Sequence, residues 1–142
     1  MTRCRVYHKP IARASRDRRT FRGVVYHSRD EMIRATELDL LVRAGAYRVT
    51  RQPKVALGLP KNEWTLDFEV ECDEGEYLYR ADGEVVEAQH WFEDVTGFET
   101  AEKRRWIELW RDYGPCLLVL MKRKGDGWVR RVVIPGPPGR KE

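Results

Sequence analysis

Asp67 is the first residue whose type and setting suggest chemistry. It lies in W-T-L-D-F-E-V-E-C, residues 64–72, whose alternating pattern predicts a β-strand. Leu66, Phe68 and Val70 share one face of that strand, which leaves Asp67 on the other. A carboxylate on a central strand needs a partner, because a buried unpaired charge is costly. Mg²⁺ is one such partner, since it binds a few carboxylates together with waters and phosphate oxygens.

The second candidate acid is Asp94, in F-E-D-V-T-G-F-E-T, residues 92–100. Asp94 and Thr96 alternate onto one face of the expected strand, and Glu93 faces the other way. The strand ends at Gly97 and a helix follows, so both side chains lie at a strand end, where sites in α/β proteins tend to form. Asp67 and Asp94 together predict a carboxylate site for magnesium.

A rival pair precedes Asp94 on the same strand. Glu87 and Gln89 also read as an acid followed two residues later by a polar side chain. They share the face of Glu93, opposite to Asp94, so both sets cannot line one site on a regular strand. A bulge near His90 would remove this conflict. Glu87 and Gln89 therefore remain an alternative second half of the site.

Two helices and a series of strands are expected to position these residues. Ser28 and Glu31 form a capping-box pattern at the start of an amphipathic helix over residues 29–44, and Gly45 stops it. Thr100 caps a second helix that closes at residues 114–115. Strands are predicted for residues 24–26, 47–50, 54–57, 64–72, 76–80, 84–95, 116–121 and 128–134, with a loop at 58–62 and a turn at 73–75.

The order of these elements predicts an α/β protein with a mixed central β-sheet flanked by helices. The apolar run 116–121 directly follows a helix, which indicates a buried strand reached by a β-α-β crossover. We expect a single domain over residues 23–134, a flexible basic arm over 1–22 and a polar tail over 135–142. The longest apolar run spans only residues 116–121, so no membrane span is expected.

Charge is distributed unevenly along the 142 residues, although the net charge is only +4. Residues 1–22 and 122–142 are both strongly basic, and the segment between them is acidic. An acidic centre between basic ends suits a metal-dependent nuclease, whose carboxylates hold the cation while Lys and Arg meet phosphates. Solvated basic termini are the other interpretation. The three cysteines form no C-x-x-C pair, which favours a reducing, cytoplasmic setting.

Five pieces of the sequence, in order, resemble a known family. They are Y-H-S-R-D-E, L-D-L-L-V-R-A-G-A-Y, R-Q-P-K-V-A-L, W-T-L-D-F and F-E-D-V-T-G-F-E-T, within residues 22–121. The chain resembles the small phage-encoded nucleases of the PD-(D/E)XK superfamily, which are related to the Holliday junction resolvases. The resemblance implies a restriction-endonuclease-like core, α-β-β-β-α-β.

The resemblance also assigns site residues. The first-helix acid of the family falls on Glu31, the "PD" acid on Asp67 and the "(D/E)" acid on Asp94, and these three would be the metal ligands. The lysine of the motif falls on Thr96, which is a departure, because threonine can hydrogen-bond a water but carries no charge. Lys103, early in the following helix, is the expected substitute.

The resemblance implies a Mg²⁺-dependent (or Mn²⁺-dependent) DNA endonuclease, with branched DNA such as a Holliday junction as the expected substrate. Two cuts across a junction imply a homodimer, and a phage protein of DNA recombination would work in the host cytoplasm. The expected contacts to the DNA backbone are arginines of the arm and of the second helix: Arg16, Arg18, Arg19, Arg22, Arg104 and Arg105. The alternative is a DNA-binding protein on an inactive nuclease scaffold, which the missing motif lysine favours.

Overall fold

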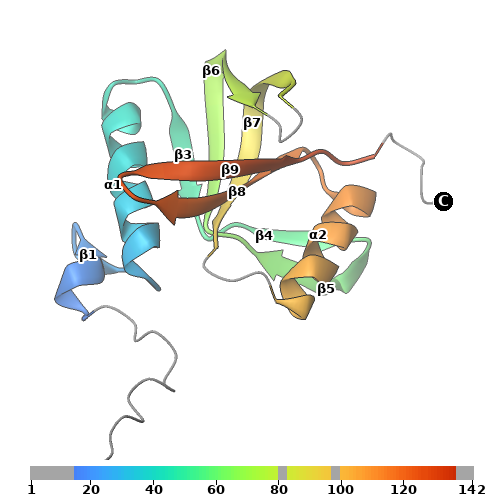
Figure 1. Ribbon diagram of the computed structural model, residues 1–142, viewed down its shortest axis with the longest axis horizontal. Coiled ribbons are helices and arrows are strands. Elements are labelled where there is room, and N and C mark those ends of the chain that lie inside the picture. The colour runs from blue at the N-terminus through green and yellow to red at the C-terminus, as the bar shows by residue number, and fades with distance from the viewer. Residues whose placement is uncertain (1–14, 80–82, 97–99, 137–142) are drawn as a thin grey trace, which may run out of the picture. The chain divides into compact units, whose positions relative to one another are not determined.

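The computed structural model describes residues 15–79, 83–96 and 100–136. The chain divides into two compact units, residues 1–37 and 38–142, and helix α1 (Arg29–Arg43) crosses the boundary between them. Each unit is described by itself, with the elements drawn in Figure 1. No helix in the described ranges combines the length and the hydropathy that a membrane span requires.

The described part of the first unit contains a short hairpin that leads into α1. A 3₁₀ turn (Asp17–Arg19) precedes strands β1 (Thr20–Phe21) and β2 (Val24–Val25), which pair antiparallel. Residues 17–21, expected in a flexible arm, thus have regular structure, and residues 1–14 of that arm lie outside the described residues. At the start of α1 the backbone N–H of Glu31 donates to Ser28 Oγ at 3.1 Å, which confirms the predicted N-cap.

The second unit is built on a mixed sheet of five strands in the order β3-β6-β7-β8-β9. Strands β7 and β8 are parallel and joined through helix α2 (Ala101–Tyr113), and the other neighbours are antiparallel. Strands β4 and β5 form a separate antiparallel pair. The strands are β3 (Arg48–Arg51), β4 (Lys54–Leu57), β5 (Leu59–Thr65), β6 (Phe68–Tyr79), β7 (Val85–Val95), β8 (Leu117–Lys124) and β9 (Gly127–Val133). The predicted α/β class and mixed sheet are confirmed.

Helix α2 covers one face of this sheet and lies beside the β4–β5 pair (Figure 1). Its buried residues Ile107 and Trp110 pack in one apolar cluster with residues of both sheets. The cluster consists of Leu57, Trp64, Leu66, Phe92, Ile107, Trp110, Leu118, Leu120 and Val133. Phe92, Leu118, Leu120 and Val133 therefore mark the face of β7, β8 and β9 that α2 covers.

The chain passes between the two sheets at one place, where two segments cross side by side. Gln52 and Pro53 separate β3 from β4, and Leu66 and Asp67 separate β5 from β6. Gln52 N donates to Asp67 O at 2.9 Å, and Leu66 N donates to Pro53 O at 3.0 Å. Pro53 has no N–H for a regular ladder, so the ribbon bends here. The predicted unbroken strand over 64–72 is wrong, and Asp67 lies at this break.

Two further local predictions are wrong. The expected loop 58–62 is largely strand β5, and the chain turns at Gly58 alone, whose φ of 81° and close approach to the Tyr113 ring require glycine. The expected turn at 73–75 lies inside β6, where the register against β7 shifts between Glu71 and Glu76. Gly75, with a φ of 82°, lies within this irregularity, so its turn signal marks a bulge instead.

Candidate functional site

Asp67 is held against the end of strand β7. Its backbone N–H donates to Glu93 O at 3.2 Å, and its Oδ2 accepts from the backbone N–H of Val95 at 2.7 Å. The bend of the ribbon makes this possible, because Asp67 is no longer fixed on the face that regular alternation would give it. Asp67 thus lies beside residues 93–95, as the two-carboxylate prediction requires.

Asp94 is the buried acid of the site, with 5% of its surface exposed. It shares the face of β7 with Phe92, which is the face that α2 covers. Lys103, in the first turn of α2, reaches across this face, and its Nζ lies 2.7 Å from Asp94 Oδ2. The carboxylate therefore has the charged partner that burial demands. The side chain of Lys103 thus points from α2 to Asp94, as expected; its role in catalysis stays a prediction.

Thr96 follows Asp94 at the end of the same strand. Its backbone N–H donates to Met121 O at 2.9 Å, which continues the pairing of β7 with β8 one step beyond the strand. Its side chain lines the same pocket as Lys103. Thr96 therefore brings a neutral hydroxyl to this pocket, and the ammonium comes from α2.

The rival acids lie elsewhere on β7. Glu87 pairs with Tyr77 and is exposed, seven residues before Asp94, which is roughly 20 Å along a strand. Gln89 is also exposed, and its Nε2 donates to Asp73 O at 2.8 Å. The irregularity near His90 lies in β6, since five residues of that strand advance against two of β7. The structure brings Asp94, and not Glu87, next to Asp67.

Glu31 belongs to the first unit. Its Oε1 accepts from the backbone N–H of His27 at 2.8 Å, so the side chain caps the helix N-terminus, one residue before the Ser28 N–H that a capping box uses. Its Oε2 is buried and has no hydrogen-bond partner among the described residues. A buried carboxylate oxygen of this kind is chemically suited to a cation. The role of Glu31 as a metal ligand stays a prediction.

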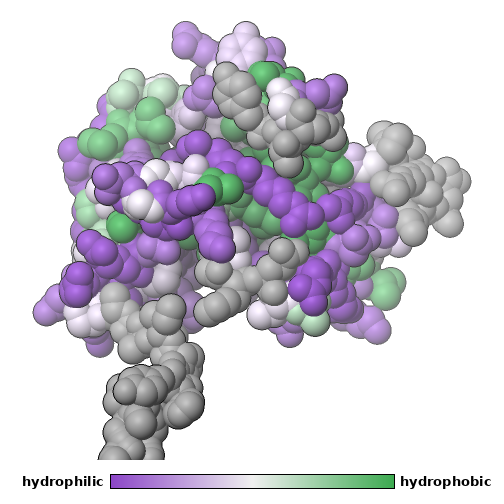
Figure 2. Space-filling view, in the orientation of Figure 1, coloured by the Kyte–Doolittle hydropathy of each residue, from purple (hydrophilic) through white to green (hydrophobic). Residues whose placement is uncertain are grey.

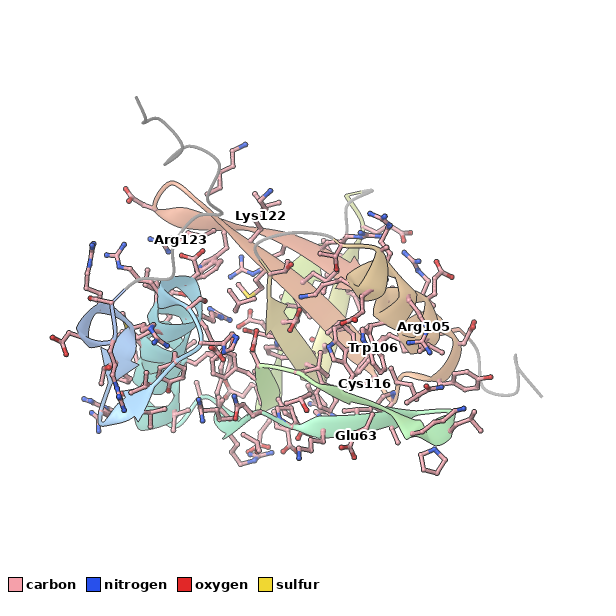
Figure 3. All side chains as sticks on the ribbon, turned by 90° about the horizontal axis from the view of Figure 1, so that it is seen from below. Glu63, Arg105, Trp106, Cys116, Lys122 and Arg123 are labelled. Atoms are coloured by element: carbon pink, nitrogen blue, oxygen red, sulfur yellow. The ribbon has the colours of Figure 1, made fainter. Side chains whose placement is uncertain are left out.

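A pocket of about 180 Å³ opens beside Lys103, between α2 and the sheet. Its residues come from α2, β8, β9 and the position just after β7, and they are Thr96, Lys103, Ile107, Leu120, Lys122, Val129 and Arg131. Lys122 and Arg131 were missed by the sequence interpretation. Figure 3 labels Lys122 on strand β8. The predicted strand 116–121 ended one residue before Lys122. The two-residue spacing of Leu118, Leu120 and Lys122 could have placed Lys122 on this face.

The six arginines predicted to contact DNA are placed differently from one another. Arg104 and Arg105 are exposed on α2, and Arg105 lies over the Trp106 ring, with 5.5 Å from its Cζ to the ring centroid (Figure 3). In the first unit Arg16, Arg18 and Arg22 are exposed. Arg19 is half-buried and donates from Nη1 to Tyr26 O at 2.6 Å. Arg19 therefore supports its own hairpin.

Asp67 and Asp94 lie on neighbouring segments at one strand end, and both are carboxylates, the side chains that divalent cations prefer. Magnesium is commonly bound through one or two carboxylates, with waters and phosphate oxygens as its remaining ligands. Within residues 15–79, 83–96 and 100–136, no group of three or more acidic, histidine or cysteine side chains is arranged to hold a metal ion. The role of Asp67 and Asp94 as metal ligands stays a prediction.

Cysteine chemistry has no support at this site. Cys116 lies at the end of the apolar cluster, and its carbonyl accepts from Trp110 Nε1 at 2.8 Å. Burial, with a smaller contribution from the charge of Glu69, raises the pKa of the Cys116 thiol to about 12. The thiol is therefore protonated near neutral pH and is a poor nucleophile.

No protein-family model, curated protein or solved structure matches this chain. The functional argument therefore depends on the residues and their geometry.

Proposed function

We propose that the chain is a metal-dependent DNA endonuclease of the PD-(D/E)XK type, which hydrolyses phosphodiester bonds. The observation that carries the proposal is the contact of Lys103 Nζ with Asp94 Oδ2, at 2.7 Å, on the strand end that also holds Asp67. Two acids and a lysine are the chemical set of that superfamily, and here the lysine comes from α2. The strand order agrees with this proposal, because β3, β6 and β7 are antiparallel neighbours and β8 returns parallel to β7 after a helix.

In this proposal Asp67 and Asp94 hold one or two Mg²⁺ or Mn²⁺ ions. When bound, the cation activates a water and neutralises charge on the scissile phosphate. Lys103 provides a fixed positive charge beside Asp94, where charge on the phosphate develops during attack. Thr96 offers a hydroxyl that can donate a hydrogen bond to the attacking water or accept one from it. The backbone N–H of Val95 fixes the Asp67 carboxylate.

The substrate is proposed to be branched DNA, such as a four-way junction, bound by its backbone and shape. Exposed arginines on α2 and in the first unit would meet phosphates without reading bases. Cutting both strands at a junction needs two sites, so we propose a homodimer. A cytoplasmic location is part of the same proposal.

A DNA-binding protein without catalysis is the second candidate. The observation that favours it is the same ion pair, because Lys103 already satisfies the buried Asp94 carboxylate without any metal. Thr96 supplies no charge in its place. The two candidates share DNA binding and differ in cleavage.

Cleavage of a labelled four-way junction and of a linear duplex of matched sequence tests the proposal. We expect cutting with Mg²⁺ or Mn²⁺, none with EDTA, and faster cutting of the junction. Asp67→Asn should abolish cutting and leave binding intact, because it removes a ligand charge but keeps the side-chain shape. Tight binding without cutting in either metal would reject the endonuclease in favour of the second candidate.

A further inference from the structure

The pocket beside Lys103 has a chemical character that the two acids alone do not explain. Three of its side chains are cationic, namely Lys103, Lys122 and Arg131, and none is acidic. Its remaining residues are Thr96 and the apolar Ile107, Leu120 and Val129. A pocket lined by both apolar side chains and cations suits an anionic group attached to an apolar unit.

The cations lie in register with Asp94 across the sheet. Asp94 pairs with Leu120 of β8, and Leu120 pairs with Arg131 of β9. These three residues therefore form one row, in which Arg131 lies two strand spacings, or about 10 Å, from Asp94 at the backbone. Lys122 and its neighbour Val129 form the next row. All are on the face that α2 covers, because each is separated by two or four residues along its strand from Leu118 or Val133 of the apolar cluster, or from Phe92 on β7.

We propose that this pocket holds a sugar-phosphate unit of the DNA strand next to the phosphate that is cut, with Lys122 and Arg131 binding its phosphate. The deoxyribose would lie against Ile107, Leu120 and Val129. This inference rests on the proposed function, since it assigns the pocket to the same DNA strand that Asp94 acts on. It adds two binding residues that neither the motif nor the family resemblance includes.

The surface around the pocket is compatible with a bound polyanion. In the orientation of Figure 1, Figure 2 shows hydrophilic surface along strand β9 and over α2. Arg104 and Arg105 add exposed positive charge on α2. Lys122 and Arg131 differ from these arginines because they line the pocket.

Matched substitutions separate a specific pocket from general charge. Lys122→Gln and Arg131→Gln each remove one positive charge inside the pocket. Lys124→Gln and Arg130→Gln remove the same charge from the same strands outside it, since Lys124 pairs with Gly127 near the β8–β9 turn and Arg130 alternates onto the opposite face. All four side chains are exposed, so the fold should tolerate each change, and thermal unfolding checks this.

The experiment is fluorescence anisotropy with labelled junction DNA in EDTA, where no cutting occurs, at several salt concentrations. We expect Lys122→Gln and Arg131→Gln to weaken binding about tenfold each and to lower the salt slope by about one. The two control variants should stay within about twofold of the parent at physiological salt, because they leave both pocket cations in place and exposed charges are partly screened.

Failure of the pocket and failure of the nuclease give different results. If the parent cuts DNA but all four variants bind alike, or if the parent shows no salt-sensitive binding in EDTA, the pocket is not a phosphate site. If the two pocket variants bind weakly but the parent never cuts, the pocket inference survives, and the protein binds DNA without hydrolysing it.

Discussion

Asp94 and Lys103 depend on each other both for stability and for the proposed chemistry. Asp94 is buried and Lys103 is only partly exposed, so removal of either charge leaves the other poorly solvated. The Asp94 partner could be anticipated from sequence, because Lys103 precedes the buried Ile107 by four residues and so shares its helix face. The positive charge that Thr96 lacks is thus supplied by Lys103 from helix α2.

Lys103→Met should therefore reduce the single-turnover cleavage rate at saturating protein by about 100-fold or more, if Lys103 stabilises charge or water in the reaction. Arg104→Met is the matched control, because Arg104 is exposed on the same helix and makes no contact with Asp94 in the structure. It should weaken binding and leave the saturated rate unchanged.

Loss of stability has to be separated from loss of chemistry in Lys103→Met. The double variant Asp94→Asn/Lys103→Met removes both charges, so urea unfolding should show stability recovered relative to Lys103→Met, because no unpaired charge remains. Full cleavage by Lys103→Met would identify Lys103 as only the structural partner of Asp94.

At the scale of elements, the bend of the β3–β4/β5–β6 ribbon is the feature that alternation could not predict. Leu66 and Phe68 have the spacing of one continuous strand, yet Leu66 joins the α2 cluster while Phe68 lies outside it. Period-two patterns report which face is apolar, but not that a strand changes sheets. Pro53 was the local signal in the sequence, and the positive φ of Gln52, 54°, appears only in the structure. The ends of α1 and α2, by contrast, follow their capping residues and were predicted closely.

The start of α2 is a second element that the site depends on. Thr100 is its N-cap, and Thr100 Oγ1 accepts from Lys103 N at 3.1 Å. Thr100→Ala should cost about 1 kcal/mol of unfolding free energy, measured by urea denaturation, because one helix N–H loses its acceptor. Thr100→Ser keeps the hydroxyl and should stay close to the parent. Equal loss in both variants would mean that the methyl group, and not the cap, stabilises this helix.

Fraying of this helix end should also affect activity. Lys103 lies in the first turn of α2, so a weaker cap leaves its ammonium less fixed against Asp94. Thr100→Ala should therefore lower cleavage, although less than Lys103→Met does.

At the scale of the whole molecule, the sequence predicts the α/β class, the mixed sheet and the crossover from β7 through α2 to β8. These follow from strong signals, namely capped amphipathic helices and an apolar run directly after a helix. The pocket could not be predicted in the same way, because it needs side chains of α2, β8, β9 and the position just after β7 at once. Nothing in the sequence distinguishes Lys122 and Arg131 from other charged residues. Only the strand register shows that they lie in rows close to Asp94.

The homodimer and the branched substrate are proposals at this same scale. The branched substrate follows from binding that reads the DNA backbone and its shape, and the homodimer follows from the two cuts that a junction requires.

The most direct test of the central claim compares Asp94→Asn with Glu87→Gln in single-turnover cleavage with Mg²⁺. Both changes remove one carboxylate charge from strand β7, but only Asp94 lies beside Asp67 and Lys103. We predict at least about a 100-fold loss of rate for Asp94→Asn. Glu87→Gln should cut like the parent, because Glu87 is exposed far along the strand. Loss of cutting in Glu87→Gln, with normal cutting by Asp94→Asn, would contradict the account and move the site to Glu87 and Gln89.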